Sequence, residues 1–362
     1  MIELSKPFLP PKKLTNGFFD LIWNSHRLTN NGPLLQKFED QLKDYFRIDN
    51  ISVVSSGTMA LQIAIKSLNL KKKIITTPFS YVATSTSIIW EGCKPVFADI
   101  NSNTLNVDPR KIEELIDKDT QAILVTHCFG NACEIDEIIE IAKNNNLKLI
   151  FDSAHCFDVE YEGKSIFNYG DISILSLHST KIFHMVEGGV LFTKNYQLKQ
   201  KFDLLRNFGH NGSEKFEGIG VNGKNSEFHA AIGLANFEYI EEILKRRKIQ
   251  VEYYDKLLFY KSIPLKKQKL NNRMTRYNYS YYPLIFPDIK TTLKVQKILF
   301  KNKIISRRYF HPLINELNYT RNKNFTPSAN KIAGKILCLP LHHYLKKKEQ
   351  EKISKIILES IN

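Results

Sequence analysis

The chain is predicted to fold as an α/β protein with a mostly parallel seven-stranded sheet and a smaller C-terminal α+β domain. Short apolar runs alternate with helical patterns as far as residue 193. These runs are rich in β-branched residues, as buried parallel strands are. A long helical pattern near residue 240 separates them from a second group of strands and helices. We therefore expect domains at 1–240 and 241–362.

The expected elements follow the chain in order. Residues 1–17 contain proline and lysine and are expected to form an extended arm, and a turn at 30–33 precedes a helix over 35–46. The expected strands lie at 51–54, 74–77, 95–100, 122–126, 148–152, 172–177 and 190–193, with helices over 58–68, 82–91, 109–116 and 134–145. No crossover helix separates the last two strands, which leaves one of them free to run antiparallel. The C-terminal pattern predicts a helix over 237–258, strands near 280–286 and 304–309, and helices near 291–301, 329–337 and 347–360.

The composition is that of a soluble globular protein, with 43% hydrophobic and 25% charged residues. The formal net charge of +15 favours anionic small molecules over nucleic acid, because the lysines are scattered without interleaved arginine and aromatic residues. The five cysteines form no CxxC pair, so we expect no metal site and a reducing, cytoplasmic location. No apolar run approaches the ~18 to 20 residues of a membrane span, and the N-terminus lacks a signal-peptide core.

Lys181 is the leading candidate for a catalytic residue. It follows the apolar run 172–177 and precedes Gly188 and Gly189. A lysine just past a buried strand is partly desolvated, which lowers its pKa and frees the amine to attack a carbonyl. Because 52 of the 362 residues are Lys or Arg, an ordinary solvated lysine is the alternative. The motifs elsewhere in the chain distinguish a catalytic lysine from a solvated one.

Other motifs also follow predicted strands, where a doubly wound sheet builds its ligand site. SSGTMAL at 55–61 opens a helix, and the free N–H groups at Gly57 and Thr58 favour a phosphate. FDSAH at 151–155 ends a strand with Asp152, which can pair with a protonated pyridine nitrogen, and places His155 near the same ligand. GVNGKNSEFHAAIG at 220–233 holds Asn222 in a glycine-rich loop. Taken singly, these motifs are also typical of helix caps, structural histidines and ordinary loops.

Together the motifs predict a site for pyridoxal 5'-phosphate, with its phosphate at Gly57, Thr58 and Ser176, its ring nitrogen at Asp152 and its aldehyde carbon on Lys181. The chain also resembles the DegT/DnrJ/StrS family of sugar aminotransferases over essentially its full length. The resembling stretches stand in family order: SSGTMAL, TTPFSYVATSTSIIWEGCKPVFADI, FDSAHCFDVEYEGK, GDISILSLHSTKIFHMVEGG, LLRNFGHNG, GVNGKNSEFHAAIG and SRRYFHPL. The resemblance implies a fold-type-I enzyme similar to aspartate aminotransferase.

The resemblance also implies a role for each site residue. Lys181 would bond to the cofactor and move the proton between cofactor and sugar carbons, while Asp152 pairs with the ring nitrogen. His155 would lie near the phenolic oxygen, and Tyr81 would cover the ring. Asn222 would reach the phosphate from the other subunit of a homodimer, beside the Gly57, Thr58 and Ser176 contacts.

Near this subunit contact the chain departs from the family. Val221 stands where the family often has Tyr, and Lys224-Asn225 where it often has Arg or Lys followed by Met or Leu. Lys224, Arg307 and Arg308 are candidates for a basic rim that would suit a pyrophosphate, and each is also readily explained as a solvated charge.

The activity implied by the resemblance is amino transfer from L-glutamate to a keto carbon of a nucleotide-linked deoxysugar. DSAH and SLHSTKIFH look closest to enzymes that aminate C4 of dTDP-4-keto-6-deoxy-D-glucose, and the product is a precursor for surface polysaccharide such as the O-antigen of lipopolysaccharide. A C3 aminotransferase acting on a dTDP-3-keto-6-deoxyhexose is the main alternative. Lys181 argues against the related dehydratases, which carry histidine there. A basic nucleic-acid-binding regulator and a catalytically silent member of the fold are the alternatives from other classes.

Overall fold

The computed structural model describes residues 1–260, 262–320 and 325–361 of the chain. Its helices are α1 (Lys12–Ser25), α2 (Pro33–Phe46), α3 (Gly57–Ser67), α4 (Val82–Trp90), α5 (Pro109–Glu113), α6 (Ile135–Asn144), α7 (Tyr196–Leu205), α8 (Glu227–Phe237), α9 (Ile240–Leu258), α10 (Ile289–Lys301), α11 (Pro327–Lys335) and α12 (Lys347–Ile361). Its strands are β1 (Ile51–Val54), β2 (Lys73–Thr76), β3 (Lys94–Phe97), β4 (Thr120–Thr126), β5 (Lys148–Asp152), β6 (Glu160–Tyr161), β7 (Lys164–Ser165), β8 (Ile172–Ser176), β9 (Gly189–Phe192), β10 (Lys266–Lys267), β11 (Met274–Arg276), β12 (Pro283–Ile285) and β13 (Ile336–Cys338). Short 3-10 turns are η1 (Cys128–Gly130), η2 (Ile166–Asn168) and η3 (Ile314–Glu316).

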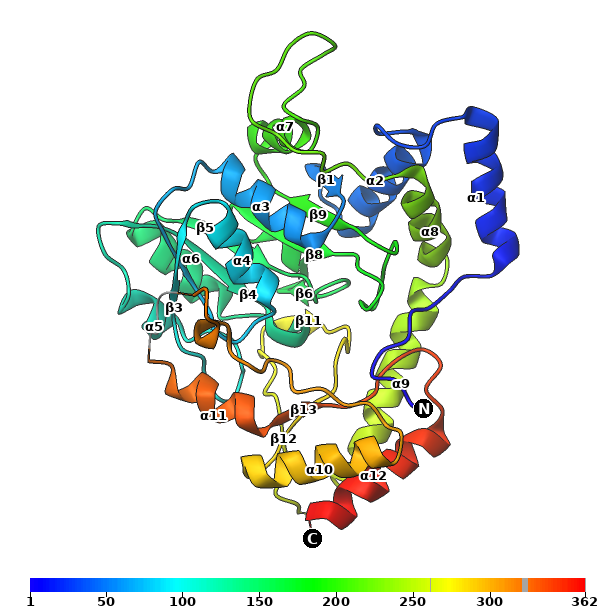
Figure 1. Cartoon of the computed structure of the whole chain (residues 1–362), viewed down its shortest axis with the longest axis vertical. Coiled ribbons are helices and arrows are strands. Elements are labelled where there is room, and N and C mark those ends of the chain that lie inside the picture. Colours follow the sequence, from blue (N-terminus) through cyan, green and yellow to red (C-terminus); the bar gives the residue numbers. More distant parts are fainter. Residues whose placement is uncertain (261, 321–324, 362) are drawn as a thin grey trace.

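A seven-stranded sheet forms the centre of the larger part of the molecule, in the order β1-β9-β8-β5-β4-β2-β3 (Figure 1). Its strands are parallel except β9, which is antiparallel to both neighbours. Side chains from α3, α4 and α7 pack on one face, and those from α2, α6 and α8 on the other. Along β5, Leu149 and Phe151 face the second layer while Ile150 faces the first, as alternation in a strand requires. The predicted α/β fold with a mostly parallel sheet is confirmed.

The connection between β8 and β9 is a broad hairpin. Leu177 N–H donates to the Gly188 carbonyl at 2.8 Å, and Ser179 N–H donates to the Val186 carbonyl at 2.8 Å. Antiparallel neighbours need no crossover helix, so the chain returns directly at the carboxyl end of β8. Lys181 lies in this hairpin.

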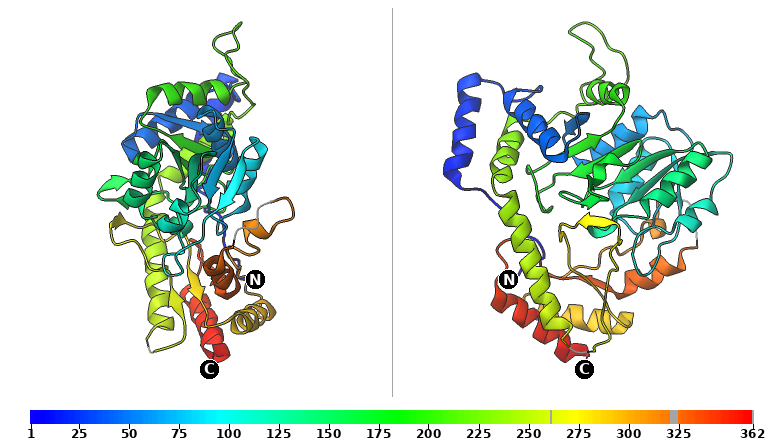
Figure 2. Two further views of the ribbon diagram at one scale, coloured as in Figure 1. Left: turned by 90° about the vertical axis from the view of Figure 1, so that its left-hand side faces the viewer. Right: turned by 180° about the vertical axis from the view of Figure 1, so that it is seen from behind.

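The smaller part of the molecule follows α9, which runs from the large sheet to the opposite end (Figure 2). A three-stranded sheet of order β10-β12-β13 packs there with α9, α10 and α12. Its apolar core includes Leu258, Leu284, Val295, Leu337 and Ile353. The division at residue 240 stays a prediction, and α9 begins at that residue.

Three expectations about local structure were wrong. The N-terminal region is extended only as far as Pro11, because α1 starts at Lys12 and buries Thr15 and Ile22. Its prolines therefore precede the helix and do not disrupt it. Residues 304–309 form no ladder, since Ile304 and Arg307 each make only an isolated bridge. Residues 336 and 337, expected at the end of a helix, belong to β13. Within the described ranges, no helix has the length and apolar character needed to cross a membrane.

Candidate active site

A cavity of about 250 Å³ lies where β4, β5 and β8 end, bounded by the first turn of α3 and by segments of the smaller part. Parallel strands deliver their carboxyl ends to one edge of the sheet, which is where ligands of such sheets bind. Its walls are formed by Ser56, Gly57, Thr58, Leu61, Ser80, Tyr81, Ala83, Thr126, Asp152, Ala154, His155, Ile174, Ser176, His178, Thr180, Lys181, Glu187, Tyr281, Arg307, Tyr309 and Phe310. The fold thus brings together all the predicted catalytic and cofactor-binding residues except Asn222.

Lys181 faces this cavity from the β8–β9 hairpin. Its backbone N–H donates to the His178 carbonyl at 2.9 Å, which closes a tight turn around Thr180. Burial lowers the pKa of the Lys181 amine from 10.5 to about 8, and the negative charge of Asp152 partly opposes that shift. Roughly a tenth of the amine is therefore neutral at pH 7, which makes it available as a nucleophile and a proton carrier.

Asp152 ends β5 and is 4% exposed. Its Oδ2 accepts a hydrogen bond from Thr84 Oγ1 at 2.7 Å and another from Thr126 Oγ1 at 3.4 Å, and its Oδ1 accepts one from the Ala154 N–H at 3.2 Å. Burial raises the pKa of this carboxyl, while these donors and the nearby Lys181 favour its charged form. The site therefore contains a buried carboxylate that still lacks a full countercharge.

Sequence reasoning missed the hydroxyl network that holds Asp152. Ser80 Oγ lies 2.8 Å from both Thr84 Oγ1 and Thr126 Oγ1, so a single serine links the two threonines. Thr84 lies within α4 and Thr126 ends β4, far apart in the chain. The only signal in the sequence was the unusual run of Ser and Thr residues inside the TTPFSYVATSTSIIW stretch.

His155 lies in the pocket wall and is 5% exposed. Burial, with a smaller contribution from Lys181, holds its pKa well below 6.5, so the ring is neutral. Its Nδ1 accepts a hydrogen bond from the Phe129 N–H at 3.2 Å, which leaves the ring proton on Nε2. His155 therefore offers a neutral N–H donor, as a partner for a phenolate oxygen should.

The α3 N-terminus provides the opposite end of the cavity. Ser56 is the N-cap, and its side chain accepts from the Met59 N–H at 3.0 Å. Gly57 and Thr58 are the first helical residues, where backbone N–H groups are free to bind an anion. A Cβ on Gly57 would lie 3.0 Å from the Ser176 Cβ, so the helix start and the end of β8 are in close contact. Ser176 is 8% exposed and adds a hydroxyl to this cradle.

Tyr81 is the N-cap residue of α4 and is 53% exposed at the mouth of the cavity. Tyr309 and Arg307 also line the cavity. Arg307 was expected as part of a basic rim, whereas Tyr309 was not expected at the site. Arg308 and Lys224 do not line the cavity, and Lys224 Nζ donates to Asn207 Oδ1 at 2.9 Å.

Asn222 lies outside the pocket of its own chain. It is exposed, and its backbone forms an isolated antiparallel bridge with Asn207. The loop between α7 and α8, which carries Asn222, projects from the body of the molecule at the top of Figure 1. Its predicted contact with the phosphate therefore requires a second copy of the chain.

The donors in the cavity fit pyridoxal phosphate. An amine, a buried carboxylate and a neutral imidazole match the aldehyde, the ring nitrogen and the phenolic oxygen. The helix N-terminus with its serine hydroxyl matches the phosphate, and the glycine there leaves no side chain in the way.

A model of the DegT/DnrJ/EryC1/StrS aminotransferase family matches residues 14–358. The chain belongs to this family. A dTDP-4-amino-4,6-dideoxy-D-glucose transaminase of Shigella dysenteriae is 39% identical over 369 residues, which cover 99% of this chain and 98% of the relative. A GDP-perosamine synthase of Caulobacter vibrioides is 30% identical over 300 residues, covering 79% of this chain and 78% of the relative. The crystal structure of DesI in the presence of its TDP-sugar product is similar at a TM-score of 0.94 and 25% identity, covering 100% and 93% of the two chains.

These relationships confirm the predicted class. The protein is a sugar aminotransferase, and the cofactor of its family is pyridoxal phosphate. The names of these relatives specify different nucleotides and sugars, so membership of the family alone does not define the substrate of this aminotransferase.

Proposed function

We propose that this aminotransferase takes an amino group from L-glutamate and transfers it to C4 of dTDP-4-keto-6-deoxy-D-glucose, forming dTDP-4-amino-4,6-dideoxy-D-glucose. The observation that carries this proposal is that Lys181, with its pKa lowered to about 8, shares one cavity with Asp152, His155 and the α3 N-terminus. The choice of sugar is supported by the Shigella dysenteriae transaminase, which aligns along nearly the whole chain.

Each residue contributes a separate property to the reaction. Bound here, pyridoxal phosphate would supply an electron sink and a carrier for the amino group. Asp152 would hold the positive charge of the ring nitrogen, and His155 Nε2–H would donate to the phenolic oxygen. Gly57, Thr58 and Ser176 would bind the phosphate. Lys181 Nζ would accept a proton from a substrate carbon and return it, a task that suits an amine with a pKa near physiological pH.

The experiment follows the two half-reactions in turn on the purified enzyme loaded with cofactor. Its visible absorbance should disappear with L-glutamate and return with dTDP-4-keto-6-deoxy-D-glucose, and Lys181→Ala should show neither change. NMR of the product then identifies the aminated carbon. If glutamate reacts and this sugar does not, or if the amine is found at C3, the proposed substrate is wrong.

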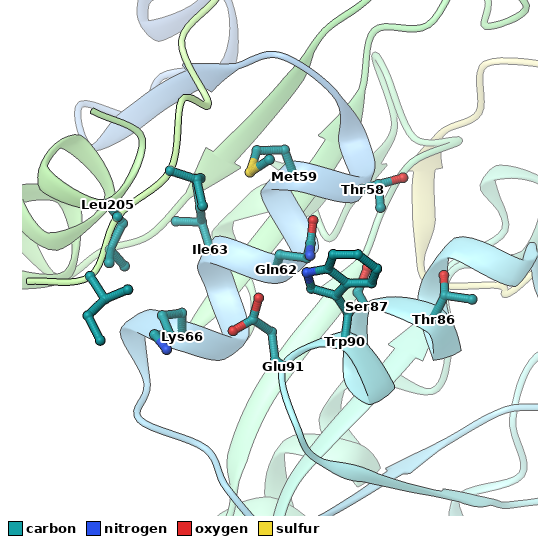
Figure 3. A pocket seen from close by; sticks show the side chains of 13 residues that line it. Thr58, Met59, Gln62, Ile63, Lys66, Thr86, Ser87, Trp90, Glu91 and Leu205 are labelled. Carbon is teal, nitrogen blue, oxygen red and sulfur yellow. The ribbon is translucent and has the colours of Figure 1, made fainter. Parts of the chain in front are cut away.

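We also propose that the enzyme is a homodimer in which Asn222 of each chain contacts the phosphate in the other. A groove of about 600 Å³ adjoins the catalytic cavity and shares Thr58 with it. Side chains of α3 and α4 meet across it, with Gln62 beside Trp90 and Lys66 on the side of Glu91 (Figure 3). Trp90 is 81% exposed and Ile219, in the projecting loop, is 82% exposed. Such large exposed apolar side chains beside a site favour burial against a second copy.

Light scattering tests the dimer directly. Trp90→Asp and Ile219→Asp should yield monomers, whereas Phe300→Asp, on the exposed face of α10, should not.

Complementation tests the shared site, because mixing Lys181→Ala with Asn222→Ala chains would assemble one intact site per mixed dimer. Recovery of activity on mixing supports the proposal, and its absence in a verified mixed dimer contradicts it.

We place the enzyme in the cytoplasm, with its product destined for surface polysaccharide. All five cysteines are free and buried, which suits a reducing compartment. Cell fractionation, and the surface polysaccharide of a deletion strain, test the two statements separately.

A further inference from the structure

The catalytic pocket contains few charges. Among its described residues, the lysine and arginine side chains are Lys181 and Arg307, and the carboxylates are Asp152 and Glu187. Both proposed substrates are anionic, since L-glutamate carries carboxylates and a nucleotide sugar carries a diphosphate. A cation at the cavity would attract each of them, and the two substrates occupy the cavity in turn.

Arg307 is held in place without being neutralised. Its backbone pairs with Cys338 in both directions, with N–H to carbonyl distances of 3.2 and 2.8 Å. Its guanidinium lies over the Tyr309 ring, 4.7 Å from the centroid. Within the part of the chain that the structure describes, no carboxylate forms an ion pair with it. Arg307 is therefore an exposed, oriented cation in the cavity wall. Its side chain also hydrogen-bonds Tyr309, and the guanidinium has further N–H donors to offer a ligand.

The other basic groups near the cavity are less suitable. Lys181 has to remain free for the chemistry at the substrate carbon. His178 Nε2 lies 3.4 Å from Glu187 Oε1, so a neighbouring carboxylate already partners it. Arg247 is buried behind the pocket, with Nη1 donating to the Leu341 carbonyl at 2.6 Å, and it borders a cavity of only about 20 Å³. Such a space accommodates a water molecule and excludes a carboxylate.

We propose that Arg307 is the shared anion receptor of both half-reactions, binding a carboxylate of the amino donor first and the diphosphate of the nucleotide sugar second. This inference rests on the proposed function. Arginine suits both roles because its planar fork forms paired hydrogen bonds with carboxylate and with phosphate alike. One receptor holds one anion at a time, so the carboxylate product has to leave before the nucleotide sugar binds. The two substrates are therefore mutually competitive through Arg307.

The test compares Arg307→Gln, Arg307→Lys and the neighbouring control Arg308→Gln in the cofactor-loaded enzyme. Single-turnover absorbance gives the concentration dependence of each half-reaction separately. Loss of a charge-assisted contact should raise the half-saturating concentrations of L-glutamate and of the nucleotide sugar each by about ten- to a hundredfold. Arg307→Lys should recover part of both, and Arg308→Gln should change neither. In Arg307→Gln, inhibition of the sugar half-reaction by 2-oxoglutarate should also weaken, because the inhibitor would bind the same arginine.

The possible results separate the two proposals. If wild-type enzyme fails with either substrate, the proposed function is wrong and this inference falls with it. If wild-type enzyme performs both half-reactions but Arg307→Gln impairs only one of them, the receptor is not shared. If Arg307→Gln impairs neither, it is not a receptor at all. Far-ultraviolet circular dichroism of each variant identifies any misfolded protein. If Arg307→Gln is misfolded, the half-saturating concentrations of Arg307→Lys are compared with those of the wild type instead.

Discussion

The pKa of Lys181 determines how fast the cofactor-free enzyme captures pyridoxal phosphate. Burial lowers that pKa from 10.5 to about 8. Only the neutral amine attacks an aldehyde, so roughly a tenth of Lys181 is reactive at pH 7, against roughly 0.03% of an ordinary lysine. We expect Lys181 to hold on the order of 300 times more reactive amine at this pH than a solvated lysine.

Stopped-flow absorbance measures this capture between about pH 6 and pH 10, with Nα-acetyl-lysine as the solvated reference and Lys181→Ala as the blank. The capture rate should rise about tenfold per pH unit and level off above about pH 8, whereas the reference should keep rising toward its ordinary pKa of 10.5. Asp152→Asn should move the inflection to lower pH, because the Asp152 charge raises the pKa of Lys181. An inflection above about pH 10 in wild-type enzyme would refute the argument that the amine is desolvated.

The same shift couples to stability with a definite sign. Because the pKa of Lys181 is lower in the folded state, the unfolded chain binds more protons between about pH 8 and pH 10.5. The contribution of this group to the free energy of unfolding of the cofactor-free enzyme therefore rises with pH across that window and is constant below it. Urea titrations of wild type and Lys181→Met, compared at each pH, isolate the effect.

Three further predictions concern the packing around the site and within the large sheet, each measured by urea unfolding at neutral pH. Thr84→Val removes the 2.7 Å bond to Asp152 and should lower the free energy of unfolding by about 1.5–3 kcal/mol, with less loss in acid where the carboxyl is protonated. Gly189→Ala puts a Cβ 2.3 Å from the Ser56 carbonyl oxygen. It should lower the free energy of unfolding by about 1–3 kcal/mol and weaken cofactor binding, and unchanged values would contradict the close packing. Arg206→Met leaves the buried carboxylate of Glu39, in α2, without its cation and should lower the free energy of unfolding by about 3–5 kcal/mol. A loss below about 1 kcal/mol would show that solvent hydrates the carboxylate in place of Arg206.

Much of the site could be predicted because its residues lie at strand ends. Asp152 and Ser176 each end an apolar run, and the geometry of a parallel sheet brings such ends together whatever the intervening sequence. Thr84 could not be found in this way, since it faces Asp152 from within a helix and its position depends on how α4 packs. The role of Asn222 was inferred by resemblance alone and stays a prediction, and the structure of one chain leaves it outside the pocket.

The less predictable parts depend on long-range packing. Residues 304–309 were expected to form a strand that begins with two isoleucines, yet their neighbours in space offer only single bridges at Ile304 and Arg307. A strand exists only where a partner is available along its length, and sequence pattern does not reveal the partner. The start of α1 was obscured by Pro10 and Pro11, which read as an extended arm although proline is well tolerated just before a helix.

The reversal of β9 explains how one short segment organises both ends of the cofactor site. A crossover helix after β8 would carry the chain away over a face of the sheet, whereas the hairpin keeps Lys181 at the strand's carboxyl end. The returning strand then passes directly beneath the start of α3, where only glycine at position 189 fits against the Ser56 carbonyl. The nucleophile and the phosphate cradle are thus fixed by the same backbone, through the hairpin hydrogen bonds at one end and the Gly189 contact at the other. A change at Gly189 should therefore disturb phosphate binding and the position of Lys181 together, although the two features lie on different elements.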